Sequence, residues 1–192
     1  MKIPFLSLLV LLSVLVMAQK QNYDIELFGK KIGQTVVERT DDGKGKVQFK
    51  LKSVSEVNVL FTHKTSLMDF DVVYKDGKLL SSYCKNVKDG ITEVVTIVWE
   101  GTRYIIKKGE EVLQMNQLVD FSAINLYYNE PKNKSRIFSE RLGKFCEFIK
   151  TAEGEYECKL ANGVNNIYRY KNGVLYELEM SKGASVFMRL AQ

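Results

Sequence analysis

His63 is the single histidine of the chain. A Ser-His-acid or Cys-His catalytic site would need this residue as its general base. The GxSxG sequence that carries the nucleophile of many hydrolases is missing from the chain. We therefore expect His63 to be a hydrogen-bonded strand residue and expect no enzymatic activity, with a hydrolase that uses His63 as the alternative.

The three cysteines are Cys84, Cys146 and Cys158. They form no CxxC sequence and no Cys/His cluster, so a structural zinc site has no ligand set. Cys146 and Cys158 flank residues 151–154, a predicted hairpin turn. A turn centred on Ala152 would place the two cysteines opposite each other, and a shift of one residue would separate them. We expect all three to be small apolar residues packed on strands, with a Cys146–Cys158 disulfide as the alternative.

Glu140 and Arg141 are adjacent charged residues in a predicted strand. Neighbouring residues on a strand point to opposite faces, so one of this pair should face the interior and need a polar partner. A structural ion pair or a solvated loop end is expected, and ligand recognition at a groove is the alternative. The phosphate-binding sequence GxxxxGK[ST] is also missing. We expect no catalytic, cofactor-binding or metal-binding residue, and the sequence identifies no ligand-binding residue.

The elements that would position these residues are predicted to be β-strands. Asp or Asn is followed by Gly between segments rich in β-branched and aromatic residues, which is the strongest local sign of a β-hairpin. This predicts a mainly β protein built from a strongly curved antiparallel meander, as a half-barrel or open barrel. The pairs are Asp42-Gly43, Asp76-Gly77, Asp89-Gly90, Asn162-Gly163 and Asn172-Gly173.

The clearest strand pattern covers residues 47–67, where apolar and polar residues alternate. We predict one long strand here with a bend near residues 53–56, and His63 on its apolar face. Residues 92–99 have apolar side chains at both odd and even positions, which favours a central strand buried on both sides. Residues 136–150 are predicted to form a further strand.

Residues 120–128 break the β pattern. We predict a short helix of two to three turns, with Asp120 or Ser122 as the N-cap and Pro131 as the stop. A single helix lying in the concave face of a curved sheet would help to fill it. The apolar residues with helical spacing are Phe121, Ile124 and Tyr128.

The N-terminal segment has the layout of a secretory signal peptide. Met1 and Lys2 precede an apolar run from residue 3 to residue 16, and Ala18 stands before a plausible cleavage point. The run is shorter than the roughly 20 residues of a membrane-spanning helix. We predict a cleaved signal peptide at residues 1–18, a single β-rich domain at residues 19–192, and a periplasmic or secreted location.

The composition argues against a nucleic-acid partner and against a transmembrane segment after the signal. The chain has 28 Lys and Arg, 23 Asp and Glu and a net charge of +5, and both signs are mixed along its length. A nucleic-acid-binding protein would concentrate basic residues on one face, so we expect no nucleic-acid partner. A second long apolar run does not occur, so no transmembrane segment is expected after removal of the signal.

Three motifs occur in order along the chain. They are Leu79-Leu80-Ser81-Ser82-Tyr83, then Leu126-Tyr127 through Glu130-Pro131, then Phe138-Ser139-Glu140-Arg141 to Gly143. In this combination the chain resembles an uncharacterised family of exported Gram-negative bacterial β-proteins, classed as a domain of unknown function. The resemblance covers essentially the whole mature chain. It implies an envelope protein and carries no functional residues.

These observations predict an exported, soluble β-protein with a non-catalytic binding or scaffolding role in the cell envelope. Curved sheets that partly enclose an apolar space can hold hydrophobic ligands, so the sharper version of this prediction is a hydrophobic or lipid-like ligand. The alternative is a small outer-membrane β-barrel, which also needs alternating strands.

Overall fold

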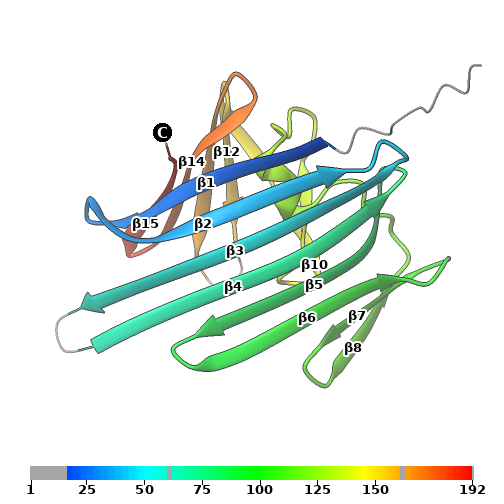
Figure 1. Ribbon diagram of the computed structural model, residues 1–192, viewed down its shortest axis with the longest axis horizontal. Coiled ribbons are helices and arrows are strands. Elements are labelled where there is room, and N and C mark those ends of the chain that lie inside the picture. Colours follow the sequence, from blue (N-terminus) through cyan, green and yellow to red (C-terminus); the bar gives the residue numbers. More distant parts are fainter. Residues whose placement is uncertain (1–16, 60–61, 161–162, 192) are drawn as a thin grey trace, which may run out of the picture.

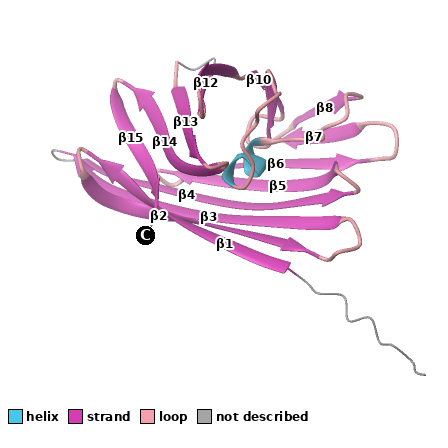
Figure 2. Cartoon of the chain, turned by 90° about the horizontal axis from the view of Figure 1, so that it is seen from above, coloured by secondary structure: helices cyan, strands magenta, loops and turns pink. Residues whose placement is uncertain are grey.

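The computed structural model describes residues 17–59, 62–160 and 163–191, and most of them belong to one curved antiparallel sheet (Figures 1 and 2). Residues 1–16 of the predicted signal peptide lie outside the described part. In order across the sheet its strands are β11 (Ile149–Ala152), β12 (Glu155–Lys159), β13 (Asn165–Lys171), β14 (Val174–Lys182), β15 (Ala184–Leu190), β1 (Met17–Leu27), β2 (Lys30–Asp41), β3 (Lys46–Val59), β4 (Thr62–Lys75), β5 (Lys78–Lys88), β6 (Ile91–Trp99), β7 (Tyr104–Lys108) and β8 (Glu111–Met115).

The sheet curls on itself without closing into a barrel. Strands that follow one another along the chain pair as hairpins, and β15 returns to pair with β1. The two ends of the sheet are β11 and β8, which are not paired with each other. The predicted fold class, a strongly curved antiparallel meander open on one side, is confirmed. Among the described residues no helix is long and apolar enough to cross a membrane.

The Asp-Gly and Asn-Gly turns account for much of this meander. Both residues of three such pairs have positive φ, as the favoured two-residue hairpin turn requires. Asn162 lies outside the described residues. The pairs with two positive φ values are Asp76-Gly77 (51° and 75°), Asp89-Gly90 (51° and 82°) and Asn172-Gly173 (53° and 77°).

The predicted long strand over residues 47–67 is wrong, because β3 and β4 pair as an antiparallel hairpin from Lys46–Lys75 to Val59–Thr62. Apolar alternation continues through this reversal, and no Gly or Pro marks it. The reversal also changes the face of His63. The buried residues of β4 are Phe70, Val72 and Tyr74, so His63, at an odd position, lies on the outer face.

Two further strand predictions are corrected by the one-sheet architecture. Strand β6 buries Val95 and Ile97 on its inner face, but Val98 is 48% exposed on the other. It is therefore buried on one side only. Residues 136–150 are not one strand, because β9 (Arg136–Ser139) and β10 (Lys144–Glu147) form a separate two-stranded sheet before β11 begins.

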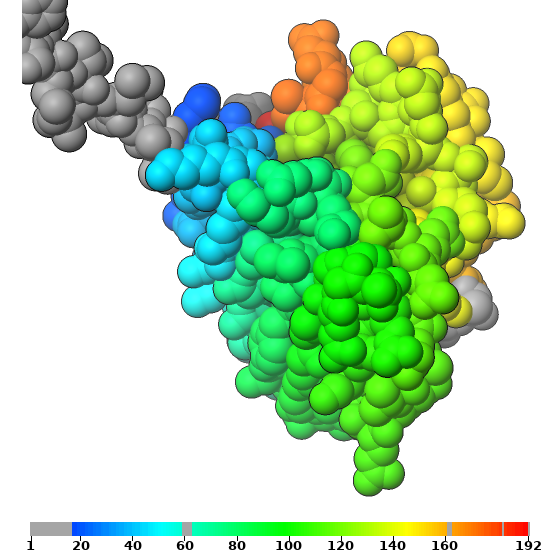
Figure 3. All heavy atoms as spheres, turned by 90° about the vertical axis from the view of Figure 1, so that its right-hand side faces the viewer, coloured from blue at the N-terminus to red at the C-terminus, as the bar shows by residue number. Residues whose placement is uncertain are grey.

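The core lies on the concave side of the sheet. There the inward side chains meet the chain that connects β8 to β11, which Figure 3 shows in yellow-green and yellow beside the green strands β5 to β8. The pattern of one buried and one solvated face is typical of antiparallel sheets. The largest fully buried side chains include Tyr23, Phe49, Tyr104, Phe138 and Tyr156.

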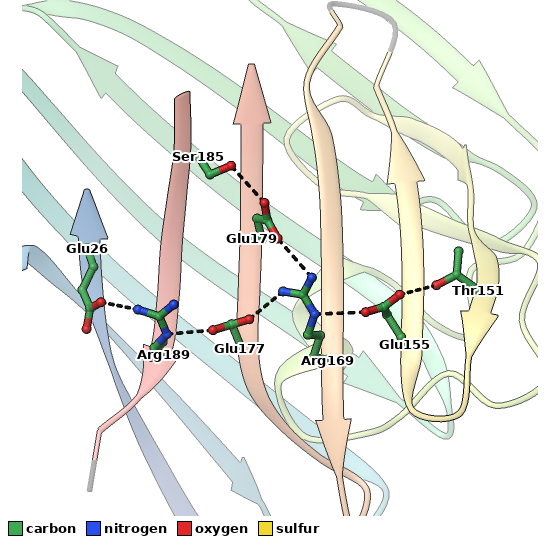
Figure 4. A network of polar contacts seen from close by, with 8 residues as sticks. All are labelled: Glu26, Thr151, Glu155, Arg169, Glu177, Glu179, Ser185 and Arg189. Atoms are coloured by element: carbon green, nitrogen blue, oxygen red, sulfur yellow. Dashed lines mark hydrogen bonds and ion pairs between the residues drawn. The ribbon is translucent and has the colours of Figure 1, made fainter. Parts of the chain in front are cut away.

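The outer face of β11 to β15 and β1 carries a ladder of charged residues, shown in Figure 4. Glu177 and Glu179 flank the buried Leu178 on β14, which places both carboxylates on the outer face. Arg169 contacts Glu155, Glu177 and Glu179 at 3.0, 2.5 and 3.1 Å. Arg189 joins Glu177 to Glu26 of β1. The ladder thus links the C-terminal strands to the N-terminal strand.

Candidate functional site

A segment at residues 119–131, called the strap below, crosses the concave face of the sheet (Figure 2). It contains η1 (Ala123–Tyr127), a 3-10 helix of five residues whose N-cap is Ser122. The predicted helix is therefore confirmed in position, and of the two candidate N-caps Ser122 is the residue used. With five residues it is shorter than the predicted two to three turns. At its C-terminal end the backbone N–H of Tyr128 donates to Asn125 O at 3.0 Å.

The N-terminus of η1 is held by buried polar groups. The backbone N–H of Ser122 donates to Asn125 Oδ1 at 2.8 Å. Tyr74 Oη of β4 donates to Ser122 Oγ at 2.6 Å, and Ser122 Oγ in turn donates to Glu140 Oε1 at 2.5 Å. This chain of bonds connects the sheet, the strap and the turn after β9.

Glu140 is the central acceptor of this network and is completely buried. Its Oε1 also accepts from the backbone N–H of Ile124 at 3.2 Å. Glu140 faces the interior, as predicted for one residue of the Glu140–Arg141 pair, but both residues lie in the turn after β9 and not in the predicted strand. Glu140 is held by hydrogen bonds from Ser122 and Ile124 in place of the expected ion pair or solvated loop end. Burial raises the pKa of the Glu140 carboxyl, and hydrogen bonds from Ser122 and nearby backbone groups only partly oppose that rise. The geometry makes Glu140 an anchor for η1.

The raised pKa of Glu140 predicts a pH dependence of stability. The folded protein holds this proton at pH values where the unfolded chain, with a carboxyl pKa near 4.5, has lost it. The stabilisation that the protonated Glu140 carboxyl gives to the folded state is therefore complete below that pH. It is lost as pH rises through the folded-state pKa of Glu140. The difference in unfolding free energy between the wild type and Glu140→Gln should fall by about 1.4 kcal/mol per unit of pKa shift. Urea titrations from pH 4.5 to 8 measure it, and parallel curves for the two proteins would contradict it.

Inward-facing tyrosines bind the rest of the strap to the sheet. Each uses its aromatic ring in the core and its hydroxyl as a hydrogen-bond donor, as buried tyrosines usually do. The hydroxyl of Tyr104 on β7 also accepts a bond from the backbone of Val119 at 3.3 Å. The donated bonds are Tyr104 to Leu79 O (2.9 Å), Tyr170 to Leu126 O (2.9 Å), Tyr156 to Glu130 Oε1 (2.9 Å) and, from the strap itself, Tyr128 to Val37 O (2.7 Å).

The strap does not fill the concave face completely. A cavity of about 80 Å³, called the apolar pocket below, lies between η1, the β3–β4 hairpin and the β13–β14 hairpin. Sequence reasoning did not find it, because its walls come from strands far apart in the chain. The lining residues are Leu51, Met68, Phe70, Ala123, Ile124, Tyr127, Tyr168 and Leu178.

A larger and more open hollow of about 630 Å³ lies between residues 132–136 and the β10–β12 region. Four cations line it, but each already has a partner. Three are paired with carboxylates: Lys132 with Glu130 at 3.8 Å, Lys134 with Asp120 at 2.5 Å and Lys150 with Glu153 at 3.0 Å. Arg136 lies over the ring of Phe145 at 4.9 Å. This hollow therefore offers less to an anion than its basic residues suggest, and the apolar pocket is the better candidate site.

His63 lies in polar surface contacts away from the concave face. Its Nδ1 is 2.9 Å from Asn58 Oδ1 and its Nε2 is 3.7 Å from Glu56 Oε1, both on the partner strand β3. It is thus a hydrogen-bonded strand residue, on the outer face rather than the predicted inner one. Within the described ranges, no group of three or more His, Cys, Asp or Glu side chains could hold a metal ion.

The cysteines are free thiols at three separate strands. Cys84 is buried in β5, as expected for an apolar residue of the core. The β11–β12 hairpin pairs Ile149 with Glu157 and Lys150 with Tyr156. Cys146 lies outside this hairpin in β10, so the turn does not place it opposite Cys158.

Comparisons with known proteins address the fold and the family. The chain is similar to a solved structure from Brucella abortus described as a beta-barrel-like protein of domain of unknown function DUF1849, with a TM-score of 0.61 and 12% sequence identity over 94% of this chain and 98% of that chain. At that identity the likeness shows the fold alone. No curated protein matches the chain. The model of the domain of unknown function DUF6134 matches residues 23–191, most of the chain, and the protein therefore belongs to the DUF6134 family.

Proposed function

We propose that this protein is an exported, non-catalytic binding protein that takes the end of an apolar chain in the apolar pocket. The observation that carries the proposal is a cavity lined by aliphatic, aromatic and methionine side chains on the concave side of an open sheet. Concave, mainly apolar sites of this kind are the usual places for small hydrophobic ligands.

The size of the pocket limits what it accepts. A volume of about 80 Å³ is well below the roughly 300–1,000 Å³ of sites that enclose a whole drug-sized ligand. The terminal carbons of an alkyl or acyl chain fit such a space, and the rest of the ligand would extend along the mouth. Met68 lines the pocket and is only half-buried. Its flexible side chain could adjust to chains of different shape.

The polar groups near the pocket support binding over catalysis. Tyr74, Ser122 and the Oε1 atom of Glu140 are bonded to one another and hold η1 in place, while Glu140 Oε2 is buried without a hydrogen-bond partner among the described residues. Export rests on the N-terminal apolar run and its cleavage-like end. The open sheet and the charge ladder on its outer face favour this proposal over a small outer-membrane barrel, which needs a closed sheet and an apolar outer band.

The test is a titration of the purified protein with a fluorescent fatty-acid probe, followed by displacement with straight-chain acids and alcohols. We expect one saturable site. Affinity should rise about fourfold for each added CH2 group, since each buried CH2 contributes about 0.8 kcal/mol, and the rise should stop once the pocket is full. Acids and alcohols of equal length should bind alike, because no cation lines the pocket. Probe signal that never saturates would overturn the proposal.

A further inference from the structure

Cys146 and Cys158 lie side by side although they belong to different sheets. Strand β10 packs against β12, with Cα atoms of the two strands within 8 Å of each other. The two thiols form a side-chain hydrogen bond. Phe148, which connects β10 to β11, stacks its ring on that of Tyr156 with centroids 5.7 Å apart and lies tilted against the ring of Tyr168 at 5.1 Å. These ring contacts hold the chain between the two cysteines against the sheet and keep the thiols together.

The third cysteine is placed where it cannot compete. Cys84 is 1% exposed and pairs with Phe70 of β4 and Val95 of β6 in the middle of the sheet. Burial raises the pKa of the Cys84 thiol to about 12. Cys146 is half-buried and therefore reachable, and Cys158 lies behind it at 5% exposure.

We propose that Cys146 and Cys158 are a disulfide-forming pair that joins the β9–β10 sheet covalently to β12 of the main sheet. The proposal rests on the contact between the two thiols and does not depend on the proposed ligand. It differs from the pairing considered in the sequence, because the cysteines meet through the packing of two sheets and not across a hairpin turn.

The reaction needs a disulfide donor, such as oxidised glutathione. The Cys146 thiolate attacks one sulfur of the donor, forms a mixed disulfide and releases one reduced thiol. The Cys158 thiol then loses its proton, its sulfur attacks that of Cys146, and the second donor thiol leaves. The protein loses two protons and two electrons, and the donor gains both. The hydrogen bond from Cys158 lowers the pKa of Cys146, which suits Cys146 to make the first attack.

The bond would tie the turn that carries Glu140, and with it the anchor of η1, to the main sheet. It closes a short loop from residue 146 to residue 158. A cross-link over a loop of this length restricts the unfolded chain, and we expect the oxidised protein to melt about 5 °C or more above the reduced protein.

The experiment is intact-mass analysis of the full protein equilibrated in glutathione redox buffers, followed by alkylation and peptide mapping. We expect a monomer that has lost two hydrogens, one alkylatable cysteine under denaturing conditions, and a cross-linked peptide pair containing residues 146 and 158. Cys84→Ser should give the same mass loss and the same shift in melting temperature. Cys146→Ser and Cys158→Ser should each abolish both.

Three results would overturn the proposal. One is retention of both hydrogens in fully oxidising buffer, with all three cysteines alkylated after denaturation. Another is a cross-link that includes Cys84, and the third is a disulfide between two protein molecules in place of the internal one. If a serine variant fails to fold, the mass and peptide map of the wild type still decide the question.

Discussion

Met68→Trp should reduce binding of an apolar probe by more than tenfold. Met68 lines the apolar pocket from β4, opposite η1. An indole at this position would occupy the space into which a chain end is proposed to insert. The side chain is half-buried at the mouth, so overpacking should cost at most about 1–3 kcal/mol and leave the fold intact. The dissociation constant of the fluorescent fatty-acid probe measures the effect.

Leu67→Trp is the matched control for this prediction. Leu67 is the preceding residue of the same strand, is 39% exposed, and points to the outer face. The same substitution there should leave the dissociation constant unchanged. Equal binding by the two variants would show that the probe does not use the apolar pocket. A melting curve for each variant separates lost binding from lost folding.

Glu140→Ala should lower the free energy of unfolding by about 4 kcal/mol. The substitution removes the acceptor of the Ser122 hydroxyl and of the Ile124 backbone N–H, both buried. A buried donor left without a partner costs about 1–3 kcal/mol, and the cavity left by the side chain adds to this. Such a loss is a large fraction of the 5–15 kcal/mol typical of a folded domain. Denaturant titration at pH 4.5, where the folded protein keeps Glu140 protonated, measures it.

Two variants bracket that effect. Glu140→Gln keeps an oxygen of similar position as acceptor, so it should lose less than half as much stability. Glu147→Ala, at an exposed residue of the neighbouring β10, should stay within about 0.5 kcal/mol of the wild type. A loss in Glu140→Ala no greater than in Glu147→Ala would mean that Glu140 does not anchor η1.

The strand content and several turns could be predicted because their signals are local. Asp76-Gly77 and Asp89-Gly90 adopt the positive φ values that their residue types favour. The reversal between β3 and β4 could not be predicted, because apolar alternation continues through it. The turn at Phe28 and Gly29 could not be predicted either. There Phe28, a non-glycine residue whose aromatic side chain is 78% exposed, takes φ 51°. Turn residues mark only some reversals.

The candidate site was less accessible from the sequence. Strand alternation predicted that one of Glu140 and Arg141 faces inward, but the pair lies in the turn after β9. The partners of Glu140, Ser122 and Ile124, were not predicted. The apolar pocket depends on β3, β4, β13 and β14 lying around η1, which no local pattern encodes. The thiol contact likewise depends on how β10 packs on β12. The partners of Glu140, the apolar pocket and the thiol contact therefore all depend on how separate segments of the chain pack together.

The pairing of β1 with β15 has a consequence for how the chain folds. Most hairpins in the sheet join neighbouring segments and can form early, but Tyr23–Leu190 and the other β1–β15 partners are separated by most of the chain. Topologies rich in such distant pairings fold slowly, in milliseconds to seconds. Until β15 arrives, one edge of β1 stays open to pairing with another molecule. Formation of this seam is therefore the step at which aggregation would compete most strongly with folding.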